Sequence, residues 1–358
     1  MKKEEIFLIT GNLLFFHDTL SSITGGKSMQ QLLNFVEDLK IRNRSSASAL
    51  LLIHNGQIIL EHYSGYHDFR KNSRPIDQRS LFNVASVRKS YLGLAVAFAL
   101  YDEKIKSLDE RVAPYFPNVD EQLLGDTTLR HLLTHSHGLE EDEHGHLFRE
   151  FPPGTNWAYR DVNVEMMAQL LDRLYGIPFT QLLAQRVFQP LQWHDTRWPQ
   201  APSNDLVPII DRLDEPATVP LGNLQNGRGL YVSTRDLAKW GMLHLNQGVV
   251  DDVQVVPKDV ISLATSLQSP TYSDESLPQN GLFWFLQHKP ASKSEIGEKV
   301  PIGSFQIIGV NGPTLLVIPE QRLVAVKMYN KRYNYGQSNY LHYLRKFSNL
   351  VSESVGKG

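Results

Sequence analysis

The chain has 358 residues, of which 41% are hydrophobic and 21% are charged, and its formal net charge is -2. This composition is typical of a folded globular protein and excludes a disordered acidic chain and a basic nucleic-acid-binding protein. Cysteine is absent, which excludes disulfide frameworks, zinc-thiolate sites, iron-sulfur clusters and a cysteine nucleophile. At about 150 residues per domain, the length predicts two domains or one large unit.

The first twenty residues make a poor export signal. Glu4 and Glu5 precede the apolar stretch 6–16, Thr10-Gly11-Asn12 interrupts it, and no small-residue cleavage site follows. The uncharged run 91–101 is shorter than the roughly 20 residues that a membrane span needs. We therefore expect a soluble, cytoplasmic protein that has no membrane partner.

In chain order, the first predicted element is a β-hairpin in residues 48–63, where two apolar runs are joined by Asn55-Gly56. A helix is predicted from residue 86 to about 102, and its apolar residues cover nearly the whole circumference, which is typical of a buried central helix. Residues 108–221 are predicted to be mostly helical, with Pro and Gly at the breaks.

The last third of the chain begins with a capping box, in which Ser233 and Asp236 open a helix that runs to Leu245. Strands follow at 305–310, 314–318 and 323–329, and a helix at 338–351. The sheet is thus predicted to form from both ends of the chain. The expected fold is α+β, with residues 1–107 and 222–358 in a sheet domain and 108–221 in an inserted, mainly helical lobe.

The most informative motif is Ser86-Val87-Arg88-Lys89, which lies where an extended segment meets the buried helix. A helix N-terminus offers Ser86 an unpaired backbone amide and a positive dipole end, both suited to an oxyanion. Lys89 is one turn further on the same face. Desolvation there would lower its pKa and make it a base toward Ser86.

The motif also has a purely structural interpretation, in which Ser86 caps the helix and Lys89 lies at the surface. The same spelling recurs at Ser354-Val355-Gly356-Lys357, where no helix follows, so the motif alone is weak.

A second component lies in the turn-rich segment 151–163. Its Tyr159 can relay protons near the Ser-Lys pair, and Asp161, two residues on in an extended stretch, points the same way; packing of a loop onto the core is the alternative.

At this point the sequence resembles the serine β-lactamase and penicillin-binding-protein-like hydrolases, especially the class C β-lactamase and family VIII esterase branch. The matching segments span about residues 48–330 in the family's order: Asn55-Gly56, 82–89, 129–139, 153–159, 229–237, 309–312 and 317–319.

The resemblance implies an antiparallel sheet flanked by helices, a helical lobe, and an active site between them. It also implies that Ser86 is the acylated nucleophile, Lys89 its proton acceptor, and Tyr159 the general acid and base of a Tyr-x-Asn element. No cofactor is implied. A backbone amide near Ile307 or Ile308 would join that of Ser86 as oxyanion donor.

Two departures from the family pattern concern the substrate. Asp161 replaces the amide of Tyr-x-Asn, and an ionised carboxylate accepts hydrogen bonds without donating any. The family's Lys/His-Thr/Ser-Gly element falls at Ser304-Phe305-Gln306, where no cation is present to receive a substrate carboxylate. Both argue against β-lactamase or D,D-peptidase activity as the main function.

Histidines and acidic residues crowd into residues 129–147, a combination that can bind zinc. No His-Glu-x-x-His helix motif occurs, and the resemblance makes 131–139 structural, so we expect no metal. The acidic run 140–143 is expected to be a solvated loop. Aromatic residues that are candidates for lining the pocket are Trp157, Tyr159, Tyr231, Phe283 and Trp284, although aromatic side chains more often pack cores.

The sequence thus predicts a serine hydrolase that forms an acyl-enzyme with a small ester or amide and resembles esterases more than true β-lactamases. The main alternative is a catalytically silent ligand sensor or interaction module on the same fold. A D,D-peptidase or weak β-lactamase and a zinc hydrolase are further alternatives.

Overall fold

The computed structural model of the chain describes residues 26–213, 215–332 and 340–355. Its central feature is a seven-stranded sheet in which all neighbouring strands are antiparallel. In spatial order the strands are β11 (Gln279–Asn280), β12 (Phe285–Leu286), β13 (Phe305–Ile308), β14 (Thr314–Ile318), β15 (Leu323–Tyr329), β1 (Ala47–His54) and β2 (Gln57–Gly65). Both ends of the chain build this one sheet, as the sequence predicted.

Both faces of the sheet are buried, and β1 shows how the sequence achieves this. Ala49 and Leu51 belong to the larger hydrophobic core, whereas Leu50 and Leu52 belong to the smaller one on the opposite face. Because successive side chains of a strand point to opposite faces, a strand covered on both sides needs a continuous apolar run. The run in β1 meets this requirement.

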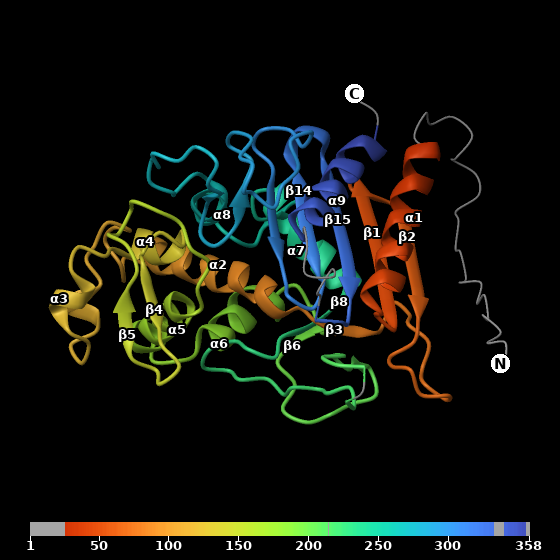
Figure 1. Cartoon of the computed structure of the whole chain (residues 1–358), viewed down its shortest axis with the longest axis horizontal. Coiled ribbons are helices and arrows are strands. Elements are labelled where there is room, and N and C mark those ends of the chain that lie inside the picture. Colours follow the sequence, from red (N-terminus) through yellow and green to blue (C-terminus); the bar gives the residue numbers. More distant parts are fainter. Residues whose placement is uncertain (1–25, 214, 333–339, 356–358) are drawn as a thin grey trace, which may run out of the picture.

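Different helices cover the two faces (Figure 1). The N-terminal α1 (Gly26–Asn43) and the C-terminal α9 (Tyr340–Ser354) pack against each other and contribute to the smaller core. The larger core contains α2 (Arg88–Tyr101), α7 (Thr234–Leu245) and α8 (Lys258–Thr265). The predicted central helix is confirmed, since residues 88–99 of α2 are all buried; the helix begins at Arg88 because the 3-10 turn η1 (Ala85–Val87) precedes it.

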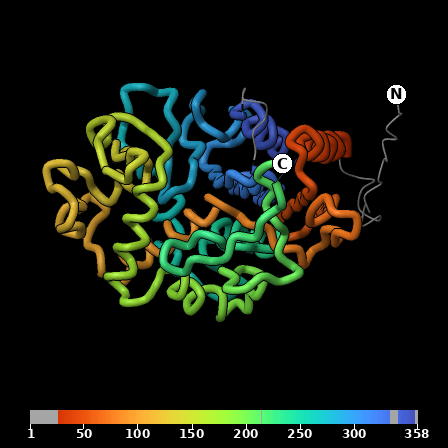
Figure 2. Tube along the Cα trace, turned by 60° about the horizontal axis from the view of Figure 1, so that its bottom comes forward, coloured from red at the N-terminus to blue at the C-terminus, as the bar shows by residue number. Residues whose placement is uncertain are grey.

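A group of shorter helices lies together beside the sheet in both views (Figures 1 and 2). It comprises α3 (Glu121–Leu124), α4 (Leu129–Leu133), α5 (Val162–Tyr175) and α6 (Phe179–Leu183). Residues 108–221 are less helical than predicted. They include the hairpin of β4 (Leu139–Glu141) and β5 (Leu147–Arg149) and an extended, proline-containing segment.

Part of that extended segment belongs to a second sheet of order β6-β8-β3-β7, formed by β6 (Thr196–Arg197), β8 (Tyr231–Ser233), β3 (Leu81–Asn83) and β7 (Leu206–Val207). These pairings tie residues 196–207 to β3. The division at residues 107 and 221 stays a prediction. The remaining short elements are η2 (Ala113–Tyr115), η3 (Ala184–Phe188), η4 (Pro319–Gln321), β9 (Val249–Val250) and β10 (Val253–Gln254).

Several local predictions can be compared directly with the structure. Ser233 caps α7, since its hydroxyl accepts a hydrogen bond from the amide of Asp236. The last helix begins at Tyr340 among the described residues, so the predicted start at Ser338 lies outside them, as do residues 1–25 with the candidate export signal. Among the described helices, none has the length and apolar character to cross a bilayer.

One side chain in the sheet is unusual, because Lys327 on β15 has no exposed surface. Within the described part of the chain its amine makes no hydrogen bond and lies 4.6 Å from the ring centre of Phe347. Burial lowers the pKa of Lys327 from 10.5 to about 7. Between these values the unfolded chain binds more protons than the folded one, so this lysine makes stability rise with pH.

We expect Lys327→Met to stabilise the protein at pH 7 by about 1–3 kcal/mol, because it removes a buried polar group without a partner. The gain should shrink as the pH rises toward 10.5, because only above this pH is the lysine mostly neutral in both states. Urea unfolding of both proteins at pH 7 and pH 10 measures this difference. An equal gain at the two pH values would contradict the assignment.

Candidate active site

Ser86 lies in the turn that joins β3 to α2. The side chain of Asn83 accepts a hydrogen bond from the amide of Ala85 at 3.1 Å, which tightens this turn. Ala85 has a φ of 47°, a left-handed conformation that costs a non-glycine residue energy and recurs at functional sites. The Ser86 side chain is half-buried, and among the described residues its hydroxyl has no hydrogen-bond partner. The turn thus presents an unengaged hydroxyl just ahead of a buried helix.

Lys89 follows in the first turn of α2 and has no exposed surface. Its amine forms an ion pair with Asp161, with 2.9 Å between Nζ and Oδ1. Burial would raise the pKa of Asp161, but the charge of Lys89, assisted by the more distant Arg88 and Arg228, outweighs burial and holds this pKa below its usual range. About 60% of the Asp161 side chain stays exposed. The ion pair therefore joins a fully buried amine to a carboxylate that contacts solvent.

Tyr159 approaches the lysine with its ring. The Lys89 amine lies 3.8 Å from the ring centre, within the range of a cation-π interaction. The same ring also stacks with the ring of His135, with 4.5 Å between the ring centres, and lies parallel to the ring of Phe285, with 6.5 Å between the ring centres. The sequence placed Tyr159 beside the Ser-Lys pair through its hydroxyl, whereas in the structure the aromatic face makes the contact.

His135 supports this aromatic wall from a strained backbone position, with a φ of 57°. Its carbonyl accepts a hydrogen bond from the amide of Ala158, and its Nδ1 lies 3.2 Å from the side-chain amide of Asn163. Burial, reinforced by the Lys89 charge, holds the pKa of His135 well below its usual range. The ring is therefore neutral at pH 7. Sequence reasoning treated His135 as structural and did not place it against Tyr159.

Ile307 and Ile308, the predicted source of the second oxyanion donor, lie at the end of β13. Pairing of β13 with β12 stops at Gln306, and the turn η1 lies against β13. Gly309 follows so close to this turn that an added Cβ would lie 2.3 Å from the carbonyl oxygen of Val84. The strand end therefore borders the Ser86 turn, and the oxyanion role of Ile307 or Ile308 stays a prediction.

The segment 304–306 carries no cation, and an acidic residue, Glu295, contacts it through its backbone. The side chain of Gln306 donates a hydrogen bond to the backbone carbonyl of Glu295 at 3.1 Å. Burial raises the pKa of Glu295 to about 8, and the opposing effect of Lys89 is smaller. Sequence reasoning missed Glu295, because no spacing rule relates it to Lys89 across about 200 residues.

The histidine-rich segment does not form a metal centre in the described residues, where no group of three potential ligand side chains comes together. His135 and His137 are buried, whereas His144 and His146 lie on the exposed turn between β4 and β5. Most of the acidic run 140–143 is exposed as expected, although Glu140 pairs with Arg160.

The candidate pocket aromatics divide into two groups. Trp157 and Phe283 lie close to the ring of His135, next to Tyr159. Tyr231, Phe283 and Trp284 are fully buried core residues, so they do not line an open pocket, whereas Trp157 is half-buried. The aromatic neighbour that the sequence did not single out is Phe285.

Comparisons with known proteins identify the family of the chain. A family model described as Beta-lactamase matches residues 32–348. An uncharacterized protein of Alkalihalophilus pseudofirmus is 40% identical over 307 residues, which are 86% of this chain and 90% of that protein.

Two solved structures share the fold. EstCE1, a hydrolase with promiscuous acyltransferase activity, has a TM-score of 0.71 at 17% identity and covers 91% of this chain and 99% of its own. A class C beta-lactamase in complex with cefoxitin has a TM-score of 0.74 at 15% identity, with coverages of 93% and 100%.

We expect Asp161→Ala to lower the free energy of unfolding at pH 7 by about 1–3 kcal/mol, because it leaves the buried Lys89 amine unpaired. In the double variant Lys89→Met/Asp161→Ala much of this loss should be recovered, which a double-mutant cycle by urea unfolding measures. The control is Asp274→Ala, which breaks the exposed pair with Lys293 and should have little effect. Additive effects of the two site substitutions would show that the pair is not coupled.

Proposed function

The chain belongs to the beta-lactamase family, and from this membership we propose that it is a serine hydrolase that forms an acyl-enzyme on Ser86. The observation that carries the proposal is the fully buried Lys89, placed one helical turn beyond Ser86 and paired with a carboxylate that reaches solvent. A covalent nucleophile needs a base within reach. Lys89 is the base that the proposal assigns.

The proposed reaction begins with transfer of a proton from Lys89 to Asp161, whose exposed side chain leads to bulk water. The free amine accepts the Ser86 hydroxyl proton while Oγ bonds to the substrate's carbonyl carbon. The amides of Ser86 and of Ile307 or Ile308 stabilise the resulting oxyanion. Collapse of this intermediate expels the leaving group, which takes up a proton from Lys89 or through the hydroxyl of Tyr159.

Water then attacks the acyl-enzyme in the same way, giving its proton to Lys89 or Tyr159 and releasing the acid with Ser86 restored. Every proton taken from a nucleophile is thus returned to a leaving group. The cycle uses side chains and backbone amides of this chain and involves no cofactor.

We propose small esters or amides as substrates, with esterase-like activity in place of true β-lactamase activity. Two features support this. The segment 304–306 has no cation for a substrate carboxylate, and Asp161 has no amide N–H to offer a substrate carbonyl when ionised. The promiscuous acyltransferase activity of EstCE1 is the same class of chemistry.

The second candidate is a catalytically silent ligand-binding protein, and the Lys89–Asp161 ion pair is the observation that favours it. An ammonium group paired with a carboxylate, as the 2.9 Å contact between Lys89 and Asp161 allows, cannot accept a proton until it gives one up. If Asp161 never accepts that proton, the site binds ligands without turning them over.

Hydrolysis of p-nitrophenyl acetate separates the two candidates. We expect turnover by the natural chain and a loss of about 1,000-fold or more in kcat/KM in Ser86→Ala, because removing a nucleophile removes the acyl-enzyme route. The matched control is Ser354→Ala, which alters the second Ser-x-x-Lys spelling in α9 and should leave the rate unchanged. Equal rates for the natural chain and Ser86→Ala would contradict the hydrolase proposal.

A further inference from the structure

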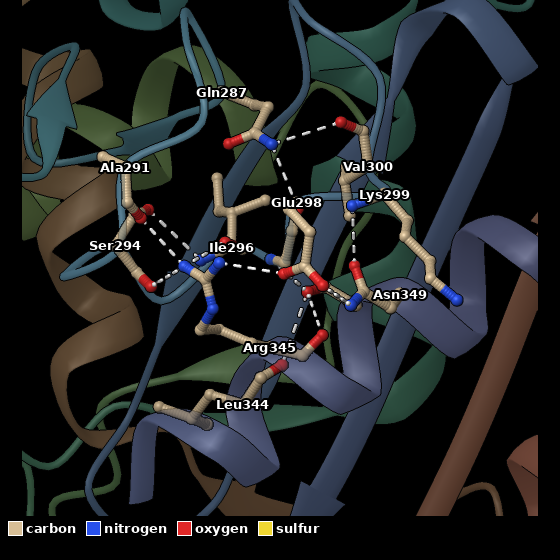
Figure 3. Close-up of polar contacts among 12 residues, drawn as sticks. Gln287, Ala291, Ser294, Ile296, Glu298, Lys299, Val300, Leu344, Arg345 and Asn349 are labelled. Carbon is tan, nitrogen blue, oxygen red and sulfur yellow. Dashed lines mark hydrogen bonds and ion pairs between the residues drawn. The ribbon is translucent and has the colours of Figure 1, made fainter. Parts of the chain in front are cut away.

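The loop formed by residues 288–303 joins β12 to β13 and is held rigidly against α9. Figure 3 shows the guanidinium of Arg345 reaching from α9 into this loop, where it donates hydrogen bonds to the carbonyl oxygens of Ala291, Ser294 and Ile296. The same side chain forms a 2.9 Å ion pair with Glu298. From the sheet side, Gln287 donates to the carbonyl oxygens of Gly297 and Val300. The loop is therefore a fixed cover on this end of the sheet.

Beneath the cover lie four polar oxygens that are buried and have no hydrogen-bond partner among the described residues. They are Oε2 of Glu295, Oγ of Ser304, Oε1 of Gln306 and Oε1 of Gln287. Both glutamine amides have a fixed orientation, since their nitrogens donate to backbone carbonyl oxygens. Their oxygens are thus left as acceptors. The cluster offers a carboxyl group, two amide oxygens and a hydroxyl, but no amine or guanidinium.

The strand register places three of these side chains on one face of the sheet. Gln306 is directly opposite Phe285, and the amide of Gln287 donates to the carbonyl of Ser304 at 2.8 Å, which continues the same register. Residues two apart on a strand share a face, and so do residues directly opposite each other. The backbone of Glu295 lies at the same face, because its carbonyl oxygen accepts the hydrogen bond from the Gln306 side chain.

This cluster lies beside the candidate active site. Phe285, opposite Gln306, has its ring parallel to that of Tyr159. Lys89 is the cation among the described residues whose charge acts on Glu295, yet its amine is already paired with Asp161 at 2.9 Å. Glu295 is therefore close to the reaction centre and is left without a counter-ion of its own, although only 8% of the residue is exposed.

A buried carboxyl group and several free acceptors are costly unless donors reach them. An ammonium group provides three N–H donors, and its positive charge lowers the raised pKa of the Glu295 carboxyl and so favours the ionised form. We propose that Glu295, Ser304 and Gln306 form a subsite for the ammonium group of a positively charged ester or amide, whose carbonyl lies at Ser86. This inference rests on the proposed hydrolase function for its catalytic readout, but the binding that it predicts is measurable without turnover.

The subsite inverts the charge preference that the family resemblance implies for this position. A cation at 304–306 would receive a substrate carboxylate, whereas here the neighbouring group is the carboxyl of Glu295. Anionic substrates would meet this acidic group together with oxygen acceptors, and would be selected against. The proposal therefore predicts a difference in kcat/KM between substrates of opposite charge, which can be measured.

Three methyl esters of nearly equal shape test the proposal: β-alanine methyl ester, methyl butanoate and monomethyl succinate, which end in an ammonium, a methyl and a carboxylate group. We expect kcat/KM, measured by titration of the released acid at pH 7, to be about tenfold or more higher for the ammonium ester than for methyl butanoate, the size of one charge-assisted hydrogen bond. The carboxylate ester should be the poorest substrate.

Glu295→Gln should abolish the preference for the ammonium ester over methyl butanoate, measured as the ratio of the two kcat/KM values. The matched control is Glu298→Gln, which removes a carboxylate from the same loop at an exposed position and should keep the preference. If Glu295→Gln does not fold, Ser304→Ala serves in its place and should reduce the preference severalfold. A preference that survives in the folded variant overturns the proposal.

Calorimetric binding to Ser86→Ala separates failure of the subsite from failure of the hydrolase proposal. The ammonium ester should bind about tenfold more tightly than methyl butanoate, and the added substitution Glu295→Gln should remove this difference. If no ester is hydrolysed but this difference is found, the subsite stands and the hydrolase proposal fails. Equal binding of the two esters overturns the subsite.

Discussion

The site depends on the removal of one lysine amine from water. Lys89 has no exposed surface, and an amine in that position is tolerated only with a counter-charge or in its neutral form. Asp161 supplies the counter-charge, while the ring of Tyr159 covers the amine from another side. Because one partner of the pair is dry and the other meets solvent, the amine has a route along which a proton can leave. Reactivity of Ser86 in the proposed mechanism follows from that route.

The rest of the fold enforces this arrangement through strained and closely packed backbone. Ala85 and His135 both adopt left-handed conformations, and they lie on either side of the Lys89–Tyr159 contact, one before the nucleophile turn and one behind the tyrosine ring. Strain of this kind persists only where surrounding structure fixes it. Asn311, in the turn after β13, donates a hydrogen bond to the side chain of Asn83 at 3.1 Å and so ties the end of β13 to the segment before Ser86.

Local patterns in the sequence were sufficient to predict the hairpin, the buried helix and the strands that form the sheet, because the formation of each depends mainly on residues that are close in sequence. The helical lobe was overestimated, because the segment after residue 195 pairs with β3 and β8 through contacts that proline and glycine spacing does not encode. The motif spacing and the family resemblance also predicted that Ser86, Lys89 and Tyr159 belong to one site. They did not predict that Asp161 would pair with Lys89, nor that Glu295 would lie near it, because the loop that carries Glu295 is placed by Arg345 on a helix 50 residues further along the chain.

Covalent labelling tests most directly whether this buried pair makes Ser86 reactive. Incubation of the intact chain with a fluorophosphonate, followed by intact-protein mass measurement and peptide mapping, reports which side chain has become a nucleophile. The account predicts one adduct per chain, carried by Ser86 and absent from Ser86→Ala. An unmodified chain, or an adduct of the same extent in Ser86→Ala, would contradict it.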